Sequence, residues 1–273
     1  MKWKITLLLS LSLGSLHAQN PLTRVIGTED AGVLWPLPDN SLSHQDAAAL
    51  QALLDYIKAV GVAPWESLKG TGTITYYDDG AELQAGSADI EIKGAELARL
   101  TQSVSQKPDV VVTTFRQGQV HYPSGKISQL SPSQSQMGLI DFPKLLSLDF
   151  SEPGSWSVSD GGNVSVNGAA AHRITLTFPI YVTKTETVTD VTAIDYYFDP
   201  STHLQMKSVA LIKPHPGTTE QYLRQTEYTD YRKVNGREVP FRFVQTFGGQ
   251  KTWALSLNTV ITDATIPDST FTF

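Results

Sequence analysis

Acidic pairs are the first side chains to test for chemistry, because two carboxylates about 5 to 10 Å apart across a cleft can hydrolyse a glycoside. Three short stretches carry such a pair: Asp78 with Asp79, Asp195 with Asp199, and Glu227 with Asp230. The first pair lies in a predicted turn, and the other two lie near predicted strand ends, where solvated carboxylates are common. Nothing in the sequence selects one pair, so a hydrolase ranks last among the functions considered.

Motifs for nucleophilic catalysis and phosphate binding are missing. The chain has no Gly-x-Ser-x-Gly elbow, which would expose a serine nucleophile. The stretch from Ser124 to Ile127 lacks the upstream glycine and the hydroxyl residue of a phosphate loop, so it predicts a hairpin tip. The absence of cysteine excludes disulfides, thiolate metal sites, a cysteine nucleophile and an acylated lipoprotein anchor.

Histidines also give no sign of a metal site. After residue 18 they are scattered, without the i, i+4 spacing or the glutamate partner of a zinc site. They are His44, His121, His172, His203 and His215. We therefore expect a protein that is not an enzyme and has no catalytic residues, no metal and no cofactor.

Residues 1–18 predict a secretory signal peptide. Lys2 and Lys4 precede an apolar run from Leu7 to Leu13, and cleavage is expected near Ala18. The run is too short to span a bilayer, and no later window approaches eighteen apolar residues. We expect a periplasmic or secreted protein without a membrane span. Its net charge of −6 argues against nucleic acid as a partner.

The elements that could position a site begin with one helix. Residues 19–43 predict an extended lead-in, and Ser43 to Asp46 resembles a capping box at the start of the helix. Gly61 and Pro64 end it. Its apolar residues recur at helical spacing: Leu50, Leu53, Leu54, Ile57 and Val60. One face of this helix is therefore expected to pack against the rest of the protein.

From Leu68 onward the pattern changes to the period of two that is typical of strands. Pairs that tolerate the positive φ angles of tight turns predict hairpins. These pairs are Asp79-Gly80, Asn167-Gly168 and Asn235-Gly236, and residues 199–202 predict a type I turn. An apolar stretch from Met137 to Phe150 interrupts the strands and predicts short helical turns.

Ten to twelve strands with one firm helix exclude the strand–helix alternation of a parallel sheet. A flat sheet of that size would be strongly twisted, so it is expected to curl. We predict a mainly β protein, in which a single curved antiparallel sheet forms an unclosed β-barrel covered by one or two helices. This domain would occupy residues 44–273.

The apolar interior of such a sheet is the remaining candidate for a functional site. A barrel too wide for its own side chains to fill holds a ligand, whereas a filled one is ordinary core, and the sequence leaves both open. The candidate lining residues are Leu50, Leu54, Ile57, Ile90, Ile92, Phe178, Phe198, Phe241, Trp253 and Leu255.

Three segments resemble the periplasmic lipoprotein-carrier superfamily, which includes LolA- and LolB-like proteins, outer-membrane lipoprotein-sorting-like proteins and the RseB sensor. The segments run from Ala88 to Leu100, from Phe198 to Leu204 and from Tyr228 to Phe241. The resemblance implies an unclosed β-barrel, lidded by helices, whose interior takes up acyl chains of lipoproteins or other hydrophobic molecules. It also implies that Arg99 holds the lid, although Leu100 follows where the carrier has an aromatic residue.

Two functions stand ahead of the hydrolase. The first is an exported, soluble, non-catalytic monomer that binds a lipid or the acyl chain of a lipoprotein inside the lidded half-barrel. The second is an interaction or sensor module for other envelope proteins, with a filled core and an exposed apolar patch. The two differ in whether the interior is open to a ligand.

Overall fold

The structure is a computed structural model that describes residues 46–61, 67–94, 97–114, 117–130, 157–181, 188–212 and 222–272. The side chains of residues 178–181, 188–192 and 212 are not described. The predicted signal peptide, the lead-in and the helical turns over 137–150 therefore lie outside the described residues. His44 and His215 lie outside them as well.

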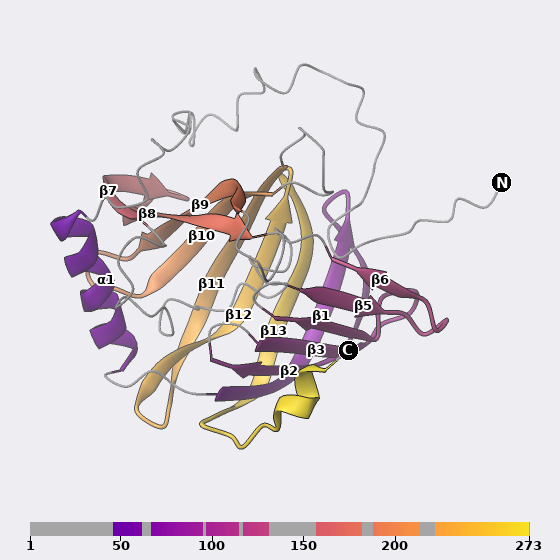
Figure 1. The fold of residues 1–273 in the computed structure, drawn as a ribbon. Helices are drawn as coiled ribbons and strands as arrows, with labels where there is room; N and C mark the ends of the chain where they lie inside the picture. Colours follow the sequence, from indigo (N-terminus) through magenta and orange to yellow (C-terminus); the bar gives the residue numbers. More distant parts are fainter. Residues whose placement is uncertain are drawn as a thin grey trace, which may run out of the picture.

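Thirteen strands form one antiparallel sheet that curls without closing (Figure 1). The first seven strands are β1 Ser67–Asp78, β2 Ala81–Lys93, β3 Leu97–Ser103, β4 Val110–Thr113, β5 Gly118–His121, β6 Ile127–Gln129 and β7 Ser157–Val166. The other six are β8 Ala169–Tyr181, β9 Val188–Phe198, β10 Gln205–Ile212, β11 Tyr222–Val234, β12 Arg237–Phe247 and β13 Gln250–Thr262. The predicted fold class is confirmed, with slightly more strands than expected.

The strand order is β6-β5-β4-β3-β2-β1-β13-β12-β11-β10-β9-β8-β7. Strand β1 pairs with β13, so the first and last strands meet near the middle of the sheet, and β6 and β7 form its two edges. Every other pair of neighbouring strands is consecutive in sequence, which is why the turn signals predicted so much of the sheet. Positive φ at Asp79 and Gly80, at Asn167 and Gly168, and at Asn235 and Gly236 confirms the three predicted hairpin turns.

Helix α1, Ala47–Val60, begins later than the predicted capping box at Ser43–Asp46 would place it. Asp46 is itself the N-cap, because its backbone is extended and its Oδ1 accepts from the backbone N–H of Ala48 at 2.8 Å. The backbone N–H of Gly61 donates to the carbonyl of Ile57 and ends the helix, as predicted. A short 3-10 helix, η2 (Asp268–Phe271), packs against β3 near the C-terminus.

Two apolar clusters lie on the inner face of the curved sheet. Residues that are paired across neighbouring strands lie on the same face of the sheet. Ile194 pairs with Ala210 in the smaller cluster. In the larger cluster Leu255 pairs with both Phe243 and Ile74, and the register places both clusters on the inner face. Helix α1 covers the smaller cluster, on β7 to β10. The larger cluster is built by β1 to β5 and β11 to β13.

The outer face carries two smaller clusters. Helix η2 closes one of them through Phe271, which packs with Val112 of β4. The end of the β7–β8 hairpin forms the other, where Val166 packs with Tyr197 and Val209. At the tip of this hairpin, Asn167 Nδ2 donates to Glu227 Oε1 on β11 at 3.0 Å. The outer face is thus closed locally by short pieces of the chain, while the inner face holds most of the core.

Candidate functional site

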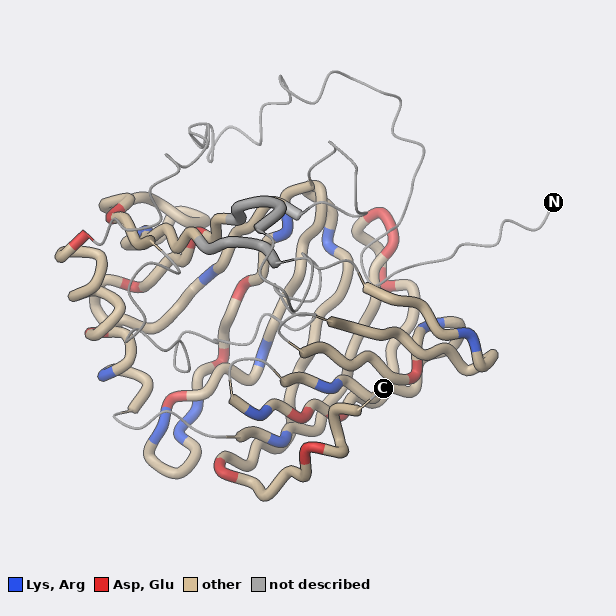
Figure 2. The backbone as a smooth tube through the Cα atoms, in the orientation of Figure 1, with Lys and Arg blue, Asp and Glu red and all other residues tan. Residues whose placement is uncertain are grey.

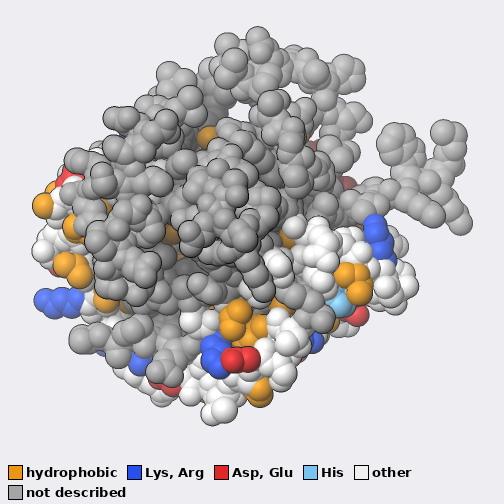
Figure 3. Space-filling model, in the orientation of Figure 1, with side chains coloured by type: hydrophobic (Ala, Val, Ile, Leu, Met, Phe, Trp, Pro, Cys, Tyr) orange, Lys and Arg blue, Asp and Glu red, His pale blue; other side chains and the backbone are white. Residues whose placement is uncertain are grey.

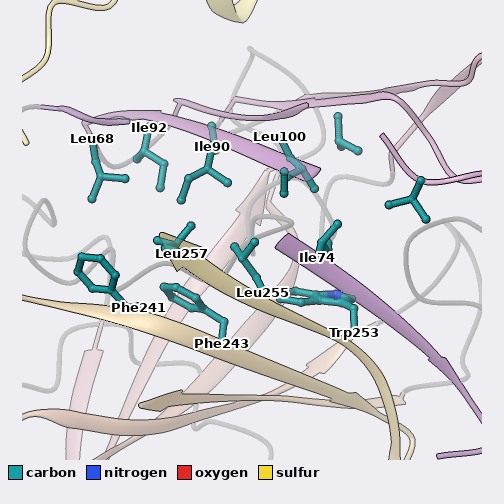
Figure 4. Close-up of a cluster of buried hydrophobic side chains, with 14 of the residues drawn as sticks. Leu68, Ile74, Ile90, Ile92, Leu100, Phe241, Phe243, Trp253, Leu255 and Leu257 are labelled. Atoms are coloured by element: carbon teal, nitrogen blue, oxygen red, sulfur yellow. The ribbon is translucent and has the colours of Figure 1, made fainter. Parts of the chain in front are cut away.

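The larger inner cluster is the candidate site. Figure 4 shows Leu68, Ile90 and Leu100 of β1 to β3 on one side and Phe243 and Leu255 of β12 and β13 on the other, pointing toward one another. Each of these five side chains is at most 2% exposed. The strands place them there because inward positions alternate with outward ones, and β1 joins the two groups by pairing with both β2 and β13. The result is a continuous apolar surface along the inside of the curl.

Helix α1 covers a different part of the inner face. Leu53 and Tyr56 are 1% and 0% exposed, and the Tyr56 ring lies 4.9 Å from that of Phe198 between centroids. Helix α1 contacts the edge strand β7 and also β12, so it lies over the half of the sheet that runs from β7 to β12 (Figure 1). Among the described residues, no helix packs against the part of the inner face that β1 to β3 and β13 form.

The structure brings most of the predicted lining residues to the inner face. The larger cluster holds five of them: Ile90, Ile92, Phe241, Trp253 and Leu255. Phe198 lies in the cluster beneath α1, and Leu50 and Ile57 are partly buried against it. Leu54, in contrast, is 55% exposed, because it follows the buried Leu53 by about 100° of helical turn. The side chain of Phe178 is outside the described residues.

Several inner-face residues were missed, although the sequence contained the signal for them. Phe243 follows Phe241 by two positions, and Ile74 and Leu257 continue alternations that the sequence already showed. Their cross-strand partners depend on register, which the Asn235-Gly236 turn fixes between β11 and β12. Period-two counting outward from each turn would have found them.

A row of polar side chains crosses the same inner face beside the apolar cluster. Ser208 of β10, Thr226 of β11, Gln245 of β12, Trp253 of β13 and Tyr76 of β1 are each paired with the next. All five are at most 3% exposed. The inner face therefore changes along the strands from apolar to polar.

Two members of this polar row are held by hydrogen bonds. Ser208 Oγ lies 3.0 Å from Tyr228 Oη, and Tyr76 Oη donates to Gln102 Oε1 at 2.8 Å. Burial raises the pKa of Tyr76 well above its usual range, so its hydroxyl stays protonated. The Tyr76 side chain is therefore held in place and uncharged.

Arg99 lies on β3 and contacts the C-terminal segment. Its Nη1 donates to the carbonyl of Thr270 at 2.9 Å, and its Nε lies 3.3 Å from Thr101 Oγ1. The guanidinium therefore ties η2 to the outer face of the sheet. The lid-holding role that the resemblance implies for Arg99 stays a prediction. The contacts with Thr270 and Thr101 are those that the described residues make with its guanidinium.

The acidic pairs do not face a common cleft among the described residues. Asp195 is 2% exposed on the outer face, where Thr175 Oγ1 donates to it and Arg173 Nη1 lies 4.0 Å away. Asp199 accepts from Ser201 and Thr202 within the β9–β10 turn, and these hydrogen bonds lower its pKa. The Asp195–Asp199 pair is thus divided between a buried site and a turn.

The other two pairs are engaged in local contacts. Glu227 accepts from Asn167, and Asp230 forms an ion pair with Arg232 at 2.6 Å. That bond lowers the pKa of the exposed Asp230. Asp79 lies in the β1–β2 turn, as predicted. None of these carboxylates is placed as a general acid opposite a second carboxylate within the described part of the chain.

Asp195 makes stability depend on pH. Burial raises its pKa, and the hydrogen bond from Thr175 and the charge of Arg173 oppose this only in part. The unfolded chain ionises this carboxyl more readily, so its contribution to stability is present below its ordinary pKa of 3.8 and is lost as pH rises through the raised value.

We expect the free energy of unfolding of the wild type, relative to Asp195→Asn, to fall from pH 4 upward. Urea unfolding at a series of pH values measures this difference. Thr175→Val should move the loss to higher pH, because it removes a hydrogen bond that lowers the pKa. A difference that is constant with pH, or that grows as pH rises, would contradict this assignment.

Metal binding has no support in the described residues, where no group of three or more His, Asp or Glu side chains could hold an ion. His172 Nε2 lies 2.7 Å from Asp160 Oδ1, and His121 lies 3.2 Å from Gln119. Gly125 forms the predicted tip between β5 and β6, with its N–H donating to the carbonyl of Tyr122. Of the described helices, none has the length and apolar character needed to cross a membrane.

Figure 2 shows acidic and basic residues interspersed along the described backbone. In Figure 3, the hydrophobic side chains visible on the described part of this face lie in small groups among polar ones. The exposed large hydrophobic residues come from four different elements: Leu54 of α1, Leu83 of β2, Ile127 of β6 and Ile261 of β13.

No family model and no curated protein sequence matches the chain. Solved structures, however, resemble it in fold. A LolA superfamily protein from Nitrosomonas europaea is 17% identical with a TM-score of 0.52, over 82% of this chain and 97% of that one. A DUF1329 family protein from Desulfovibrio piger is 10% identical with a TM-score of 0.55, over 82% and 97%.

A putative outer membrane lipoprotein-sorting protein domain from Vibrio parahaemolyticus is 11% identical with a TM-score of 0.52, over 82% of this chain and 96% of that one. These identities are too low to transfer an activity, but the matches extend over nearly the whole of each solved chain. The resemblance noted in three sequence segments is therefore confirmed at the level of fold: the unclosed antiparallel sheet of this chain is similar to the fold of a LolA superfamily protein and of a lipoprotein-sorting protein domain.

Proposed function

We propose that the protein is exported and binds a lipid, or the acyl chain of a lipoprotein, against the inner face of its sheet, without catalysing a reaction. One observation carries the proposal. The apolar surface of β1 to β3, β12 and β13 is continuous, and among the described residues the only long helix packs over β7 to β10 and reaches this surface only at β12. A curved sheet whose apolar side is not covered by its own helices is suited to an apolar ligand.

The size of the hydrophobic effect makes this surface suitable for an alkyl chain. Burial of each methylene stabilises a complex by about 0.8 kcal/mol, before the cost of immobilising the ligand. Side chains such as Ile90, Phe243 and Leu255 offer contacts and no charge. The fold that the chain shares with a LolA superfamily protein and a lipoprotein-sorting domain supports the same ligand class.

A second function is favoured by the burial of this cluster in the ligand-free protein. Its members are at most 8% exposed, which is what a filled core would give. The protein would then act on other envelope proteins through its surface. Within the described part of the chain, the four exposed large hydrophobic residues lie on four separate elements, whereas a docking surface would bring them together, so this function ranks second.

Native mass spectrometry of the protein purified from its own cell envelope, together with solvent extraction, tests the proposal. We expect a bound amphiphile in the spectrum and in the extract. Added decanoate or longer fatty acids should raise Tm, since a ligand at a hundredfold excess over its Kd stabilises by about 2.7 kcal/mol, or about 5 to 10 °C for a domain of this size.

Butyrate, which has the same headgroup and too short a chain, is the control and should leave Tm unchanged. The protein should be a monomer in the same native spectra. An empty protein in the spectrum and the extract, with no change of Tm on adding fatty acids, would contradict lipid binding and favour the filled-core module.

A further inference from the structure

The polar row of the inner face contains two buried atoms that have no hydrogen-bond partner. Thr226 Oγ1 and Trp253 Nε1 are buried, and neither finds a partner among the described residues. Their side chains are 1% and 2% exposed. Leaving a buried polar atom unpaired costs about 1 to 3 kcal/mol, so such atoms are rare in folded proteins and need an explanation.

These two atoms lie close together on the inner face. Thr226 is paired with Gln245 and Gln245 with Trp253, so a single residue separates them across the sheet. Residues paired in this way have Cβ atoms about 5 Å apart. Gln245 Oε1 accepts from Thr252 Oγ1 at 3.2 Å. The side-chain oxygen of Gln245 therefore already has a partner. The unpaired Thr226 Oγ1 and Trp253 Nε1 belong to the residues paired with Gln245 on either side.

The chemistry of the row favours a ligand group that accepts hydrogen bonds. An indole N–H only donates, and a threonine hydroxyl can donate. Arg224 precedes Thr226 by two residues on the same face of β11 and is 5% exposed, so it adds a positive charge. Lys107 lies at the far side of the row, with its Nζ 4.4 Å from the centroid of the Tyr76 ring, and is 8% exposed. The Asp78 carboxylate interacts with Lys107 and offsets its charge, whereas Arg224 places a positive charge beside Thr226.

The apolar cluster begins at the next inward position along the same strands. Tyr228 follows Thr226 on β11, Phe243 precedes Gln245 on β12, and Leu255 follows Trp253 on β13. These three residues are paired across the strands in the same order. Figure 4 shows the Trp253 ring inside the cluster beside Leu255 and Ile74. A single ligand can therefore meet donors at one end and an apolar surface at the other.

We propose that Arg224, Thr226 and Trp253 bind the anionic headgroup of an amphiphile whose alkyl chain lies along Phe243, Leu255 and Ile74. The inference rests on the proposed function and narrows its ligand to an acidic lipid, with the oxygens of a carboxylate or a phosphate accepting from Trp253 Nε1 and Thr226 Oγ1. The oxygen of a neutral lipid of the same chain length can accept these hydrogen bonds but carries no charge, so it would bind more weakly.

Calorimetric titration with three probes of equal chain length tests the headgroup: decanoate, decyl phosphate and decanol. The wild-type protein should bind at least one anion about tenfold or more tightly than decanol, since hydrogen bonds to charged groups are the strong ones. The tighter of the two anions identifies the headgroup. Equal affinity for decanol and both anions would overturn this inference and leave lipid binding intact, whereas no binding of any probe would overturn both.

Two variants each remove one donor: Thr226→Val keeps the shape of the side chain, and Trp253→Phe keeps an aromatic ring of smaller size. Each should weaken binding of the anion about 3- to 10-fold and weaken binding of decanol less. Thr229→Val, an exposed threonine on the same strand, is the matched control and should bind like the wild type. Unchanged anion affinity in both interior variants would overturn the proposal.

The Tm of the variants without added ligand is a second measurement. If the Thr226 hydroxyl only stabilised the fold, its removal would lower Tm. Replacing an unpaired buried polar group by an apolar one of similar shape is neutral or stabilising. Thr226→Val should therefore show a Tm equal to or above that of the wild type while it loses anion affinity. A clear fall in Tm would show that the hydroxyl is already paired within the protein and would overturn the proposal.

Discussion

Leu255→Ala is expected to lower the free energy of unfolding by about 2 to 5 kcal/mol. Leu255 is fully buried at the centre of the inner cluster and is paired with Ile74 on one side and Phe243 on the other. Its removal costs the transfer free energy of the lost methyl and methylene groups, and the paired strands around it cannot collapse fully into the space.

Leu83→Ala is the matched control, because it makes the same chemical change at a leucine that is 56% exposed on β2. That variant should stay within about 0.5 kcal/mol of the wild type. Urea unfolding monitored by circular dichroism gives both values. Similar losses in the two variants would contradict the placement of Leu255 in the core.

Leu53→Ala should produce the second large effect, a loss of about 2 to 5 kcal/mol, because α1 is held to the sheet by a few buried side chains. Leu53 is 1% exposed and packs in the cluster with Ile174, Ile194 and Phe198. A 14-residue helix is marginal on its own in water, so its stability comes from this docking.

Leu54→Ala, one residue further along the same helix, is the control. Its side chain is 55% exposed, so the substitution should change stability by no more than about 0.5 kcal/mol. Amide hydrogen exchange of α1 measures the docking directly, and Leu53→Ala should speed exchange in the helix while Leu54→Ala leaves it unchanged. Equal behaviour of the two variants would contradict the docked face described above.

The architecture was predictable because most of its pairing is local. Asp-Gly and Asn-Gly turns fix the hairpins and their register, and alternation in stretches such as Ala88 to Ile92 identifies the inward positions. The C-terminal end of the helix was predicted correctly, but its start was predicted too early. Asp46 could serve either inside a capping box or as the cap itself, and only the extended backbone at that residue decides between them.

The candidate site was only partly predictable, because it depends on contacts between distant segments. The polar row requires the pairing of β1 with β13, and the β12–β13 ladder shifts register between Gln245 and Thr246. No local pattern reveals either feature. The partner of Arg99 is the carbonyl of Thr270, 171 residues away. Which part of the sheet α1 covers is likewise set by packing and not by the sequence of the helix.

Photocrosslinking with a fatty acid that carries a diazirine near the end of its alkyl chain tests the central claim most directly. After irradiation, digestion and mass spectrometry locate the adducts on the chain. The account predicts saturable labelling of inner-face residues such as Ile74, Ile90, Phe243 or Leu255, and competition by unlabelled fatty acid. Labelling confined to outer-face residues such as Leu83 and Ile261, or labelling that does not saturate, would contradict it.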